Sequence, residues 1–191
     1  MTTLFNADTS DGLKITSDTS GLIEFQSAGV TKAGVNATGL TGDGSQLTSL
    51  PSGTGPTFSA YASAALSLAA GTATKVQINT EEWDTNANFD TGNYRFTPTV
   101  AGYYQVNGAI AGSPSGAGYF SVQIYKNGSS YKQGTNFPIS ATYGPNSVVS
   151  VIVHLNGTTD YVELYALSQN INSLGGASSL TYFQGYLART A

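Results

Sequence analysis

Apolar and polar residues alternate along much of the C-terminal part of the chain, at the period of two that is typical of β-strands. The alternation is clearest in Tyr119–Lys126 and Tyr161–Leu167, where one face of each strand is apolar and the other polar. Turn-forming residues separate several similar short segments, which together indicate a β-sandwich or jelly roll. The predicted strands are Phe58–Ala62, Lys75–Ile78, Tyr94–Phe96, Tyr103–Ile110, Tyr119–Lys126, Val148–Leu155, Tyr161–Leu167 and Leu180–Leu187.

Two Asn-Gly pairs mark candidate hairpin turns. Asn127-Gly128 and Asn156-Gly157 each follow a predicted strand. A two-residue type I′ turn needs positive φ at both central residues, which Asn and Gly tolerate. Both pairs therefore predict β-hairpins, whereas Asn79–Asn93 and Gly134–Asn146 are expected to be long loops.

One predicted strand does not follow the alternation. In Val148–Leu155 the odd positions are all apolar, and the even positions include Val148 and Ile152 beside Ser150 and His154. A strand that is apolar on both faces is expected to be buried on both. Because a two-layer sandwich covers only the inner face, the outer face needs a second subunit, and the pattern predicts an oligomer.

The first 55 residues contain little core material. Leu13–Thr16 and Leu22–Phe25 flank a five-residue turn and predict a β-hairpin, which is marginal on its own in water. A Gly-, Ser- and Thr-rich segment follows and should become ordered only against copies of itself or another protein. We therefore expect an arm at 1–50, a linker at 51–56 and an all-β domain at 57–191.

The composition agrees with this division and excludes several functions. Glu, Lys, Arg and Met are scarce, so only Ser63–Ala70 has helical character. Seven scattered basic residues and a net charge of −4 argue against binding of nucleic acid. The chain has no cysteine and one histidine, which excludes thiolate chemistry and disfavours a multi-histidine metal centre. We expect no secretory signal peptide and no membrane-spanning segment.

Candidate catalytic groups are few. His154 lies in a predicted strand, where a packed or interface residue is the favoured interpretation. Glu81, Glu82, Asp84 and Asp90 form the densest acidic cluster; they are interpreted as a solvated loop, with a cation site or a glycosidase pair as the alternatives. No serine stands in a nucleophile elbow, and no phosphate-binding glycine loop is present. The sequence predicts no enzyme, no cofactor and no resident metal.

Spaced motifs in residues 56–191 resemble the C1q/tumour-necrosis-factor-like jelly roll. They are Pro56–Ala60, Trp83–Asp90, Gly92–Pro98 with Ala101–Val106, Tyr125–Gly128, Asp160–Leu164 and Thr181–Leu187. The resemblance covers about seven-tenths of the chain and implies a homotrimer of ten-stranded all-β jelly rolls. By position, it places Val148, Ile152 and Tyr182 at the trimer interface, in agreement with the two-sided strand described above.

The N-terminal arm is similar to the short repeats that begin bacteriophage head and tail fibres, on the segments ITSDTSGLIEFQSAGVTKAGVNATG and LTGDGSQLTSLP. That resemblance implies a virion protein assembled in the bacterial cytoplasm. We expect a trimeric capsid decoration (cement or head-fibre) protein whose arm binds the major capsid protein or another virion protein. The apolar residues expected to anchor the arm are Leu4, Phe5, Leu13, Ile15, Ile23 and Phe25.

Two other functions stay open at this stage. A tail-fibre tip would use exposed tyrosines and loops of the knob to recognise a host surface glycan. A polysaccharide depolymerase would need paired catalytic groups, and none stands out; loss of turnover after Glu82→Gln or Asp84→Asn would revive this alternative. Copy number in the virion separates the first alternative from a decoration protein, since hundreds of copies indicate decoration and a few dozen at most indicate a fibre.

Overall fold

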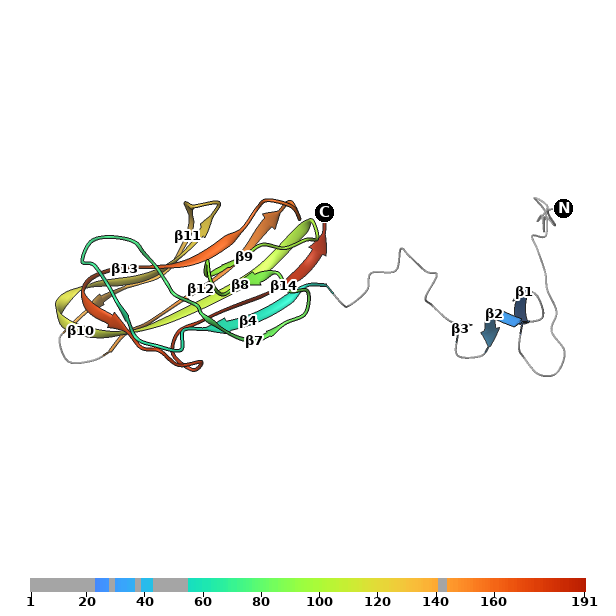
Figure 1. The fold of residues 1–191 in the computed structure, drawn as a ribbon, viewed down its shortest axis with the longest axis horizontal. Coiled ribbons are helices and arrows are strands. Elements are labelled where there is room, and N and C mark those ends of the chain that lie inside the picture. The colour runs from blue at the N-terminus through green and yellow to red at the C-terminus, as the bar shows by residue number, and fades with distance from the viewer. Residues whose placement is uncertain (1–22, 28–29, 37–38, 43–54, 141–143) are drawn as a thin grey trace. The chain divides into compact units, whose positions relative to one another are not determined.

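A computed structural model describes residues 23–27, 30–36, 39–42, 55–140 and 144–191 (Figure 1). The chain divides into two units, Met1–Ser52 and Gly53–Ala191, and each is described by itself. Every described element is a β-strand or a turn. No helix in the described ranges is long and apolar enough to span a membrane.

The N-terminal unit contains a three-stranded antiparallel sheet in the order β1 (Ile23–Ser27), β2 (Val30–Asn36) and β3 (Gly39–Gly42). Strand β1 pairs with β2, which follows it, and the predicted hairpin of residues 13–16 with 22–25 stays a prediction, because residues 13–16 lie outside the described residues. The Gly- and Thr-rich segment after β1 was expected to have no structure of its own, yet it forms β2 and β3. Backbone pairing between neighbouring segments needs no large apolar side chains, so these strands could not be predicted from the composition.

The C-terminal unit is a β-sandwich whose two sheets share one long strand (Figure 1). Sheet 1 has the order β7-β4-β14-β10-β12, and sheet 2 has the order β11-β10-β13-β9-β8, with β5 and β6 also paired to β13. The strands are β4 (Thr57–Tyr61), β5 (Leu66–Ser67), β6 (Thr74–Lys75), β7 (Thr80–Asp84), β8 (Phe89–Asp90), β9 (Arg95–Phe96), β10 (Gly102–Lys126), β11 (Ser129–Ile139), β12 (Asn146–Leu155), β13 (Val162–Leu174) and β14 (Tyr182–Thr190).

Strand β10 connects the two layers. Its first part, Gly102–Ala111, pairs with β12 in sheet 1, and from Gly112 onward the strand pairs with β13 in sheet 2. The register is irregular on both sides of Pro114, where the missing amide hydrogen interrupts the ladder. Two predicted strands are therefore one continuous segment, and the described part of the sandwich has eleven strands by this division, where ten were expected.

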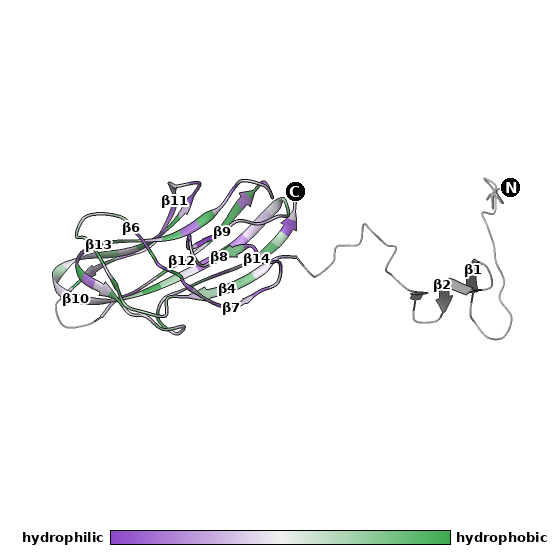
Figure 2. Cartoon of the chain, viewed as in Figure 1, coloured by the Kyte–Doolittle hydropathy of each residue, from purple (hydrophilic) through white to green (hydrophobic). Residues whose placement is uncertain are grey.

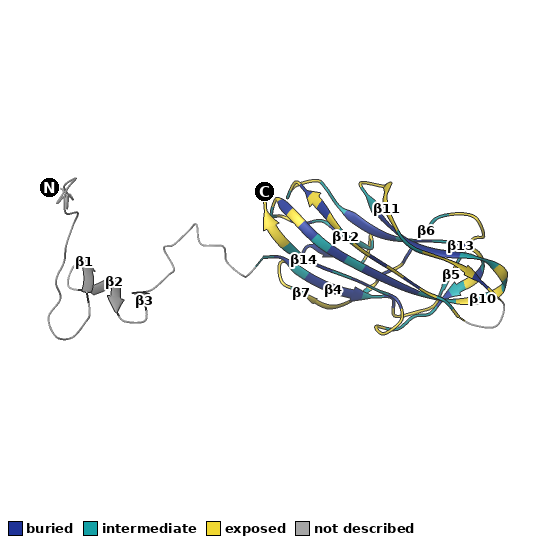
Figure 3. Cartoon of the chain, turned by 180° about the vertical axis from the view of Figure 1, so that it is seen from behind, coloured by how far each residue is buried: buried dark blue, intermediate teal, exposed yellow. Residues whose placement is uncertain are grey.

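The core lies between the sheets and contains a cluster of aromatic rings. The Phe58 ring stacks on Phe96 with centroids 4.2 Å apart and on Phe89 at 5.2 Å, and it meets the edge of Phe183 at 5.1 Å. Beside them Tyr104 is fully buried, and this burial raises its pKa to about 12. Buried residues alternate with more exposed ones along β12 and the first part of β10 (Figure 3), and hydrophobic residues alternate with hydrophilic ones on the strands of the sandwich (Figure 2).

Several sequence predictions of secondary structure were wrong. The expected loop Asn79–Asn93 contains β7 and β8, and the expected loop Gly134–Asn146 contains the second half of β11. Ser63–Ala70 forms no helix and instead contributes β5 at Leu66–Ser67, because the edge of β13 offers it backbone partners. The predicted strand Lys75–Ile78 shortens to Thr74–Lys75, although Val76 and Ile78 are fully buried.

The two Asn-Gly pairs have different structures. Asn127 and Gly128 have φ of 52° and 76° and join β10 to β11 as a tight hairpin, which confirms that prediction. Asn156-Gly157 forms no hairpin, because β12 and β13 belong to different sheets. The Asn156 side chain instead accepts hydrogen bonds from the backbone N–H groups of the next residues, Thr158, Thr159 and Asp160, and so turns the chain from one sheet to the other.

A carboxylate, Asp160, ties the two Asn-Gly turns together at one end of the sandwich. Asn127 Nδ2 donates to Asp160 Oδ1 at 2.7 Å, and Lys126 Nζ lies 2.9 Å from Asp160 Oδ2. These bonds favour the ionised carboxylate, so Asn127 first and Lys126 second lower the pKa of Asp160. A group whose folded-state pKa is lowered stabilises the fold above its unfolded-state pKa, about 3.9, and loses that contribution as the pH falls through the folded-state pKa.

We therefore expect Asp160→Asn to reduce the free energy of unfolding at pH 7, with a smaller difference from the wild-type protein at pH 3. Urea denaturation at the two pH values measures the difference. Glu81→Gln, which changes an exposed carboxyl on β7, serves as the matched control. An equal difference at both pH values would show that Asp160 contributes nothing through its charge.

Candidate subunit interface

The outward side of sheet 1, called face 1 here, is built by alternate residues of its strands. In β10 the residues Tyr104 and Val106 point into the core, so the odd positions around them point outward. The register of β4, β14, β10 and β12 sets these outward residues opposite one another in rows. Face 1 consists of Thr57, Ser59, Tyr61, Trp83, Tyr103, Gln105, Asn107, Ala109, Val148, Ser150, Ile152, His154, Tyr182, Gln184 and Tyr186.

Large apolar side chains are exposed together on face 1. Val148 is 53% exposed and Ile152 is 59% exposed, two of the highest values for large apolar residues in the described ranges. Of the eight large apolar residues that are exposed there, five belong to face 1: Trp83, Tyr103, Val148, Ile152 and Tyr186. Single exposed apolar residues are ordinary on protein surfaces, but a gathering on one sheet face makes that face a candidate interaction site.

The outward side of sheet 2 differs, because its own side chains cover it. Tyr125 and Tyr165 stack with ring centroids 3.7 Å apart, and the Arg95 guanidinium lies 4.7 Å from the centre of the Tyr161 ring. Beneath them Glu163 is 3% exposed and pairs with Lys75. Burial and, second, the charge of Glu163 raise the pKa of Tyr165. One sheet is thus closed by the chain itself, whereas face 1 is open.

The predicted interface residues all lie on face 1. Tyr182 is opposite Ala109, which is opposite Val148, so the three form one row across β14, β10 and β12. Ile152 lies two rows further along β12. The sequence prediction did not name Tyr103, Tyr186 and Trp83, which are also exposed on face 1, since their outward direction follows from strand register and an aromatic residue in the sequence does not by itself tell core from surface.

His154 lies at one end of face 1, beside Tyr103. The two rings meet edge to face with centroids 5.2 Å apart, and the backbone oxygen of His154 accepts a hydrogen bond from Lys126 Nζ at 2.8 Å. His154 is exposed, and no serine or carboxylate among the described residues is hydrogen-bonded to its ring. The geometry fits a surface residue of an interface and not a member of a catalytic triad.

The acidic cluster does not form a ligand set. Asp84 accepts from the backbone N–H groups of Asn86 and Phe89, and Asp90 accepts from those of Gly92 and Asn93. The Asn93 side chain and backbone lower the pKa of Asp90. These carboxylates therefore stabilise turns, and the described residues include no group of three acidic, histidine or cysteine side chains placed to hold a metal ion.

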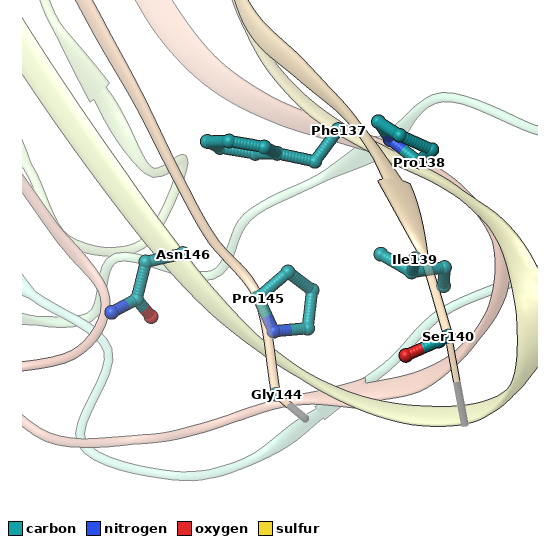
Figure 4. Close-up of a pocket in the computed structure, with 7 residues that line it drawn as sticks. All are labelled: Phe137, Pro138, Ile139, Ser140, Gly144, Pro145 and Asn146. Atoms are coloured by element: carbon teal, nitrogen blue, oxygen red, sulfur yellow. The ribbon is translucent and has the colours of Figure 1, made fainter. Parts of the chain in front are cut away.

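A hollow of about 200 Å³ lies beside the end of β11 (Figure 4). None of its described lining residues is ionisable; they are Phe137, Pro138, Ile139, Ser140, Gly144, Pro145 and Asn146. It borders residues 141–143, which lie outside the described ranges.

The residues predicted to anchor the arm are only partly within the described chain. Ile23 and Phe25 lie in β1. Leu4, Phe5, Leu13 and Ile15 lie outside the described residues. Their role in anchoring remains a prediction from the sequence.

Comparison with known proteins identifies the fold. No protein-family model and no curated protein matches the sequence. The globular domain of zebrafish complement 1qA matches with a TM-score of 0.55 and 15% identity, over 72% of this chain and 99% of that domain. Murine APRIL matches with a TM-score of 0.55 and 9% identity, over 70% and 99% of the two chains. The TNF protein Eiger from S. frugiperda has a TM-score of 0.54 and 10% identity, over 71% and 92%.

The sandwich is a C1q/TNF-like jelly roll. At these identities the likeness shows the fold alone, and this confirms the predicted all-β fold class. It also agrees with the order of the motifs along the sequence, from Pro56–Ala60 in and before β4 to Thr181–Leu187 at β14. The C1q/TNF-like domain thus presents one self-covered sheet and one sheet whose outward side, face 1, is open.

Proposed function

We propose that the C1q/TNF-like domain is a trimerisation knob in which two further copies of the chain cover face 1. The observation that carries this proposal is the contrast between the two sheets, since five large apolar side chains stand exposed on face 1 while the outward side of sheet 2 is closed. Burying a Val or Ile side chain contributes about 1.5–3 kcal/mol, so leaving Val148 and Ile152 in water forgoes a large stabilisation. The resemblance to C1q/TNF-like domains implies three copies rather than two.

The knob belongs, in this proposal, to a non-enzymatic virion protein of a bacteriophage that decorates the capsid. The similarity of the N-terminal segment to phage fibre repeats supports this assignment. Residues 1–50 would bind the major capsid protein or another virion protein, and the knob would project outward. Three arms on one knob give high overall avidity even when each single contact is weak.

Deleting residues 1–50 tests whether the arm attaches the protein to the particle while the knob alone forms the trimer. We expect the truncated chain to remain a folded trimer, because face 1 and the core lie wholly in Gly53–Ala191, and to lose binding to virus particles depleted of the protein. Light scattering measures the mass of the truncated chain, and co-sedimentation with particles measures attachment. A truncated knob that still decorates particles would show that the arm is not the anchor.

A tail-fibre tip that binds a host surface glycan is the second candidate. Tyr131 and Phe137 favour it, because these aromatic side chains are exposed on β11 and lie outside face 1. Aromatic rings can stack on the apolar faces of sugars while polar neighbours bind the hydroxyl groups. Quantitative mass spectrometry of purified virions separates the candidates, since hundreds of copies indicate capsid decoration and a few dozen at most indicate a fibre.

A further inference from the structure

Face 1 contains a row of polar side chains between its apolar residues. Ser59, Gln184, Asn107 and Ser150 lie opposite one another across β4, β14, β10 and β12, as the register of the three strand pairs shows. We call these four residues the polar row. On β12, Ser150 stands midway between the two most exposed large aliphatic residues of the described ranges, Val148 and Ile152.

Hydrogen bonds already organise one end of the polar row. Gln105, from the neighbouring row of β10, donates through Nε2 to Ser150 Oγ at 2.9 Å and to Asn107 Oδ1 at 3.3 Å. The three side chains thus form a network across β10 and β12, which we call the Gln105 network. It holds the polar atoms of two strands in one defined arrangement.

A subunit that covers Val148 and Ile152 must also cover the Gln105 network. Residues two apart on a strand lie about 6.6 Å apart, so Ser150 is within about 6.6 Å of both aliphatic side chains. Polar groups taken out of water destabilise the complex unless each finds a hydrogen-bond partner. Any surface that covers face 1 must therefore supply hydrogen-bond partners for the Gln105 network.

The groups of the network that lack a hydrogen-bond partner include both donors and an acceptor, so two copies of the network can satisfy each other. Gln105 uses both Nε2 hydrogens, which leaves its Oε1 as an acceptor. Asn107 Nδ2 and the Ser150 hydroxyl keep hydrogens to donate, and neither donates one to another described residue. A surface with both donors and acceptors is matched by another copy of itself, whereas a purely apolar partner would leave all three unsatisfied.

We infer that the Gln105 network is a specificity device, in which Asn107 and Ser150 of one copy donate hydrogen bonds to Gln105 of the next and thereby fix the register and the number of subunits. The inference rests on the proposed trimer. A single buried polar layer within an apolar interface lowers stability but excludes alternative arrangements that leave its groups unpaired. The apolar rows supply affinity, and the network selects one assembly.

The first test replaces the network by apolar side chains. In the triple variant Gln105→Leu, Asn107→Leu and Ser150→Ala, we expect association at least as tight as in the wild-type protein but with at least two oligomeric masses in native mass spectrometry. A single trimeric mass in the folded triple variant would overturn the inference. Circular dichroism confirms the β-fold, and if the triple variant does not fold, the second test decides.

The second test uses Asn107→Asp, with Asn136→Asp as the matched control. Asn136 is an exposed residue of β11 outside face 1, so the same change there should leave the trimer intact. At pH 7 we expect Asn107→Asp to weaken trimer association at least tenfold in analytical ultracentrifugation, because the variant replaces two donor hydrogens by a charge. Association within twofold of wild type would overturn the inference. A monomeric wild-type chain would instead refute the proposed trimer itself.

Discussion

Replacing Ile152 with aspartate is expected to convert the proposed trimer into a folded monomer. Ile152 is 59% exposed on face 1, so the single chain loses no core contact when its side chain changes. In the trimer, each copy would bury a carboxylate without a partner, which costs about 3–5 kcal/mol. At 1.4 kcal/mol per factor of ten, association weakens at least about 100-fold for each copy.

Light scattering after size exclusion measures the mass, and circular dichroism reports whether the fold is kept. Tyr131→Asp is the matched control, because Tyr131 is an exposed apolar residue of β11 outside face 1 and the change introduces the same charge. A trimer that persists in the Ile152→Asp variant would mean that face 1 is not the subunit interface. Loss of the trimer in both variants would point to a general effect of charge.

The sequence predicted the strands that carry a clear apolar pattern and missed the polar, exposed ones. Phe120, Val122 and Ile124 are fully buried as expected, because apolar residues at alternate positions indicate which side of the strand faces the core. Strand β7 is an exposed edge strand with three charged residues, so it has no apolar pattern to detect. Strand β11 is likewise mostly exposed and has no regular apolar alternation, and it is a strand because the edge of β10 offers backbone partners.

A local sequence pattern also does not decide the structure of every turn or every residue of face 1. Asn127-Gly128 and Asn156-Gly157 carry the same local signal, and only the pairing of distant strands decides that the first is a hairpin and the second a crossing between sheets. Val148 and Ile152 were predictable because they break an alternation that should make them polar. The Gln105 network was not, since its members become neighbours only through the register of β10 against β12.

Truncating Phe58 to alanine is expected to produce the largest loss of stability within a single chain. The Phe58 side chain is 1% exposed and contacts three other rings, Phe89, Phe96 and Phe183. Phe→Ala in a core costs about 3–5 kcal/mol, through lost transfer free energy and the cavity left behind. For a domain of this size, that corresponds to a fall in Tm of roughly 10–20 °C.

The measurement is sharpest in the Ile152→Asp background, because the Tm of an oligomer depends on concentration and that of a monomer does not. Phe58→Leu keeps most of the volume and should lose markedly less than Phe58→Ala. The free energy of unfolding of Phe137→Ala, at an exposed position of β11, should stay within about 0.5 kcal/mol of the value before this change.

Because Phe58 lies on β4 of sheet 1, while Phe89 and Phe96 lie on β8 and β9 of sheet 2, its ring joins the two layers. A loss below about 1 kcal/mol for Phe58→Ala would mean that the layers are held together elsewhere.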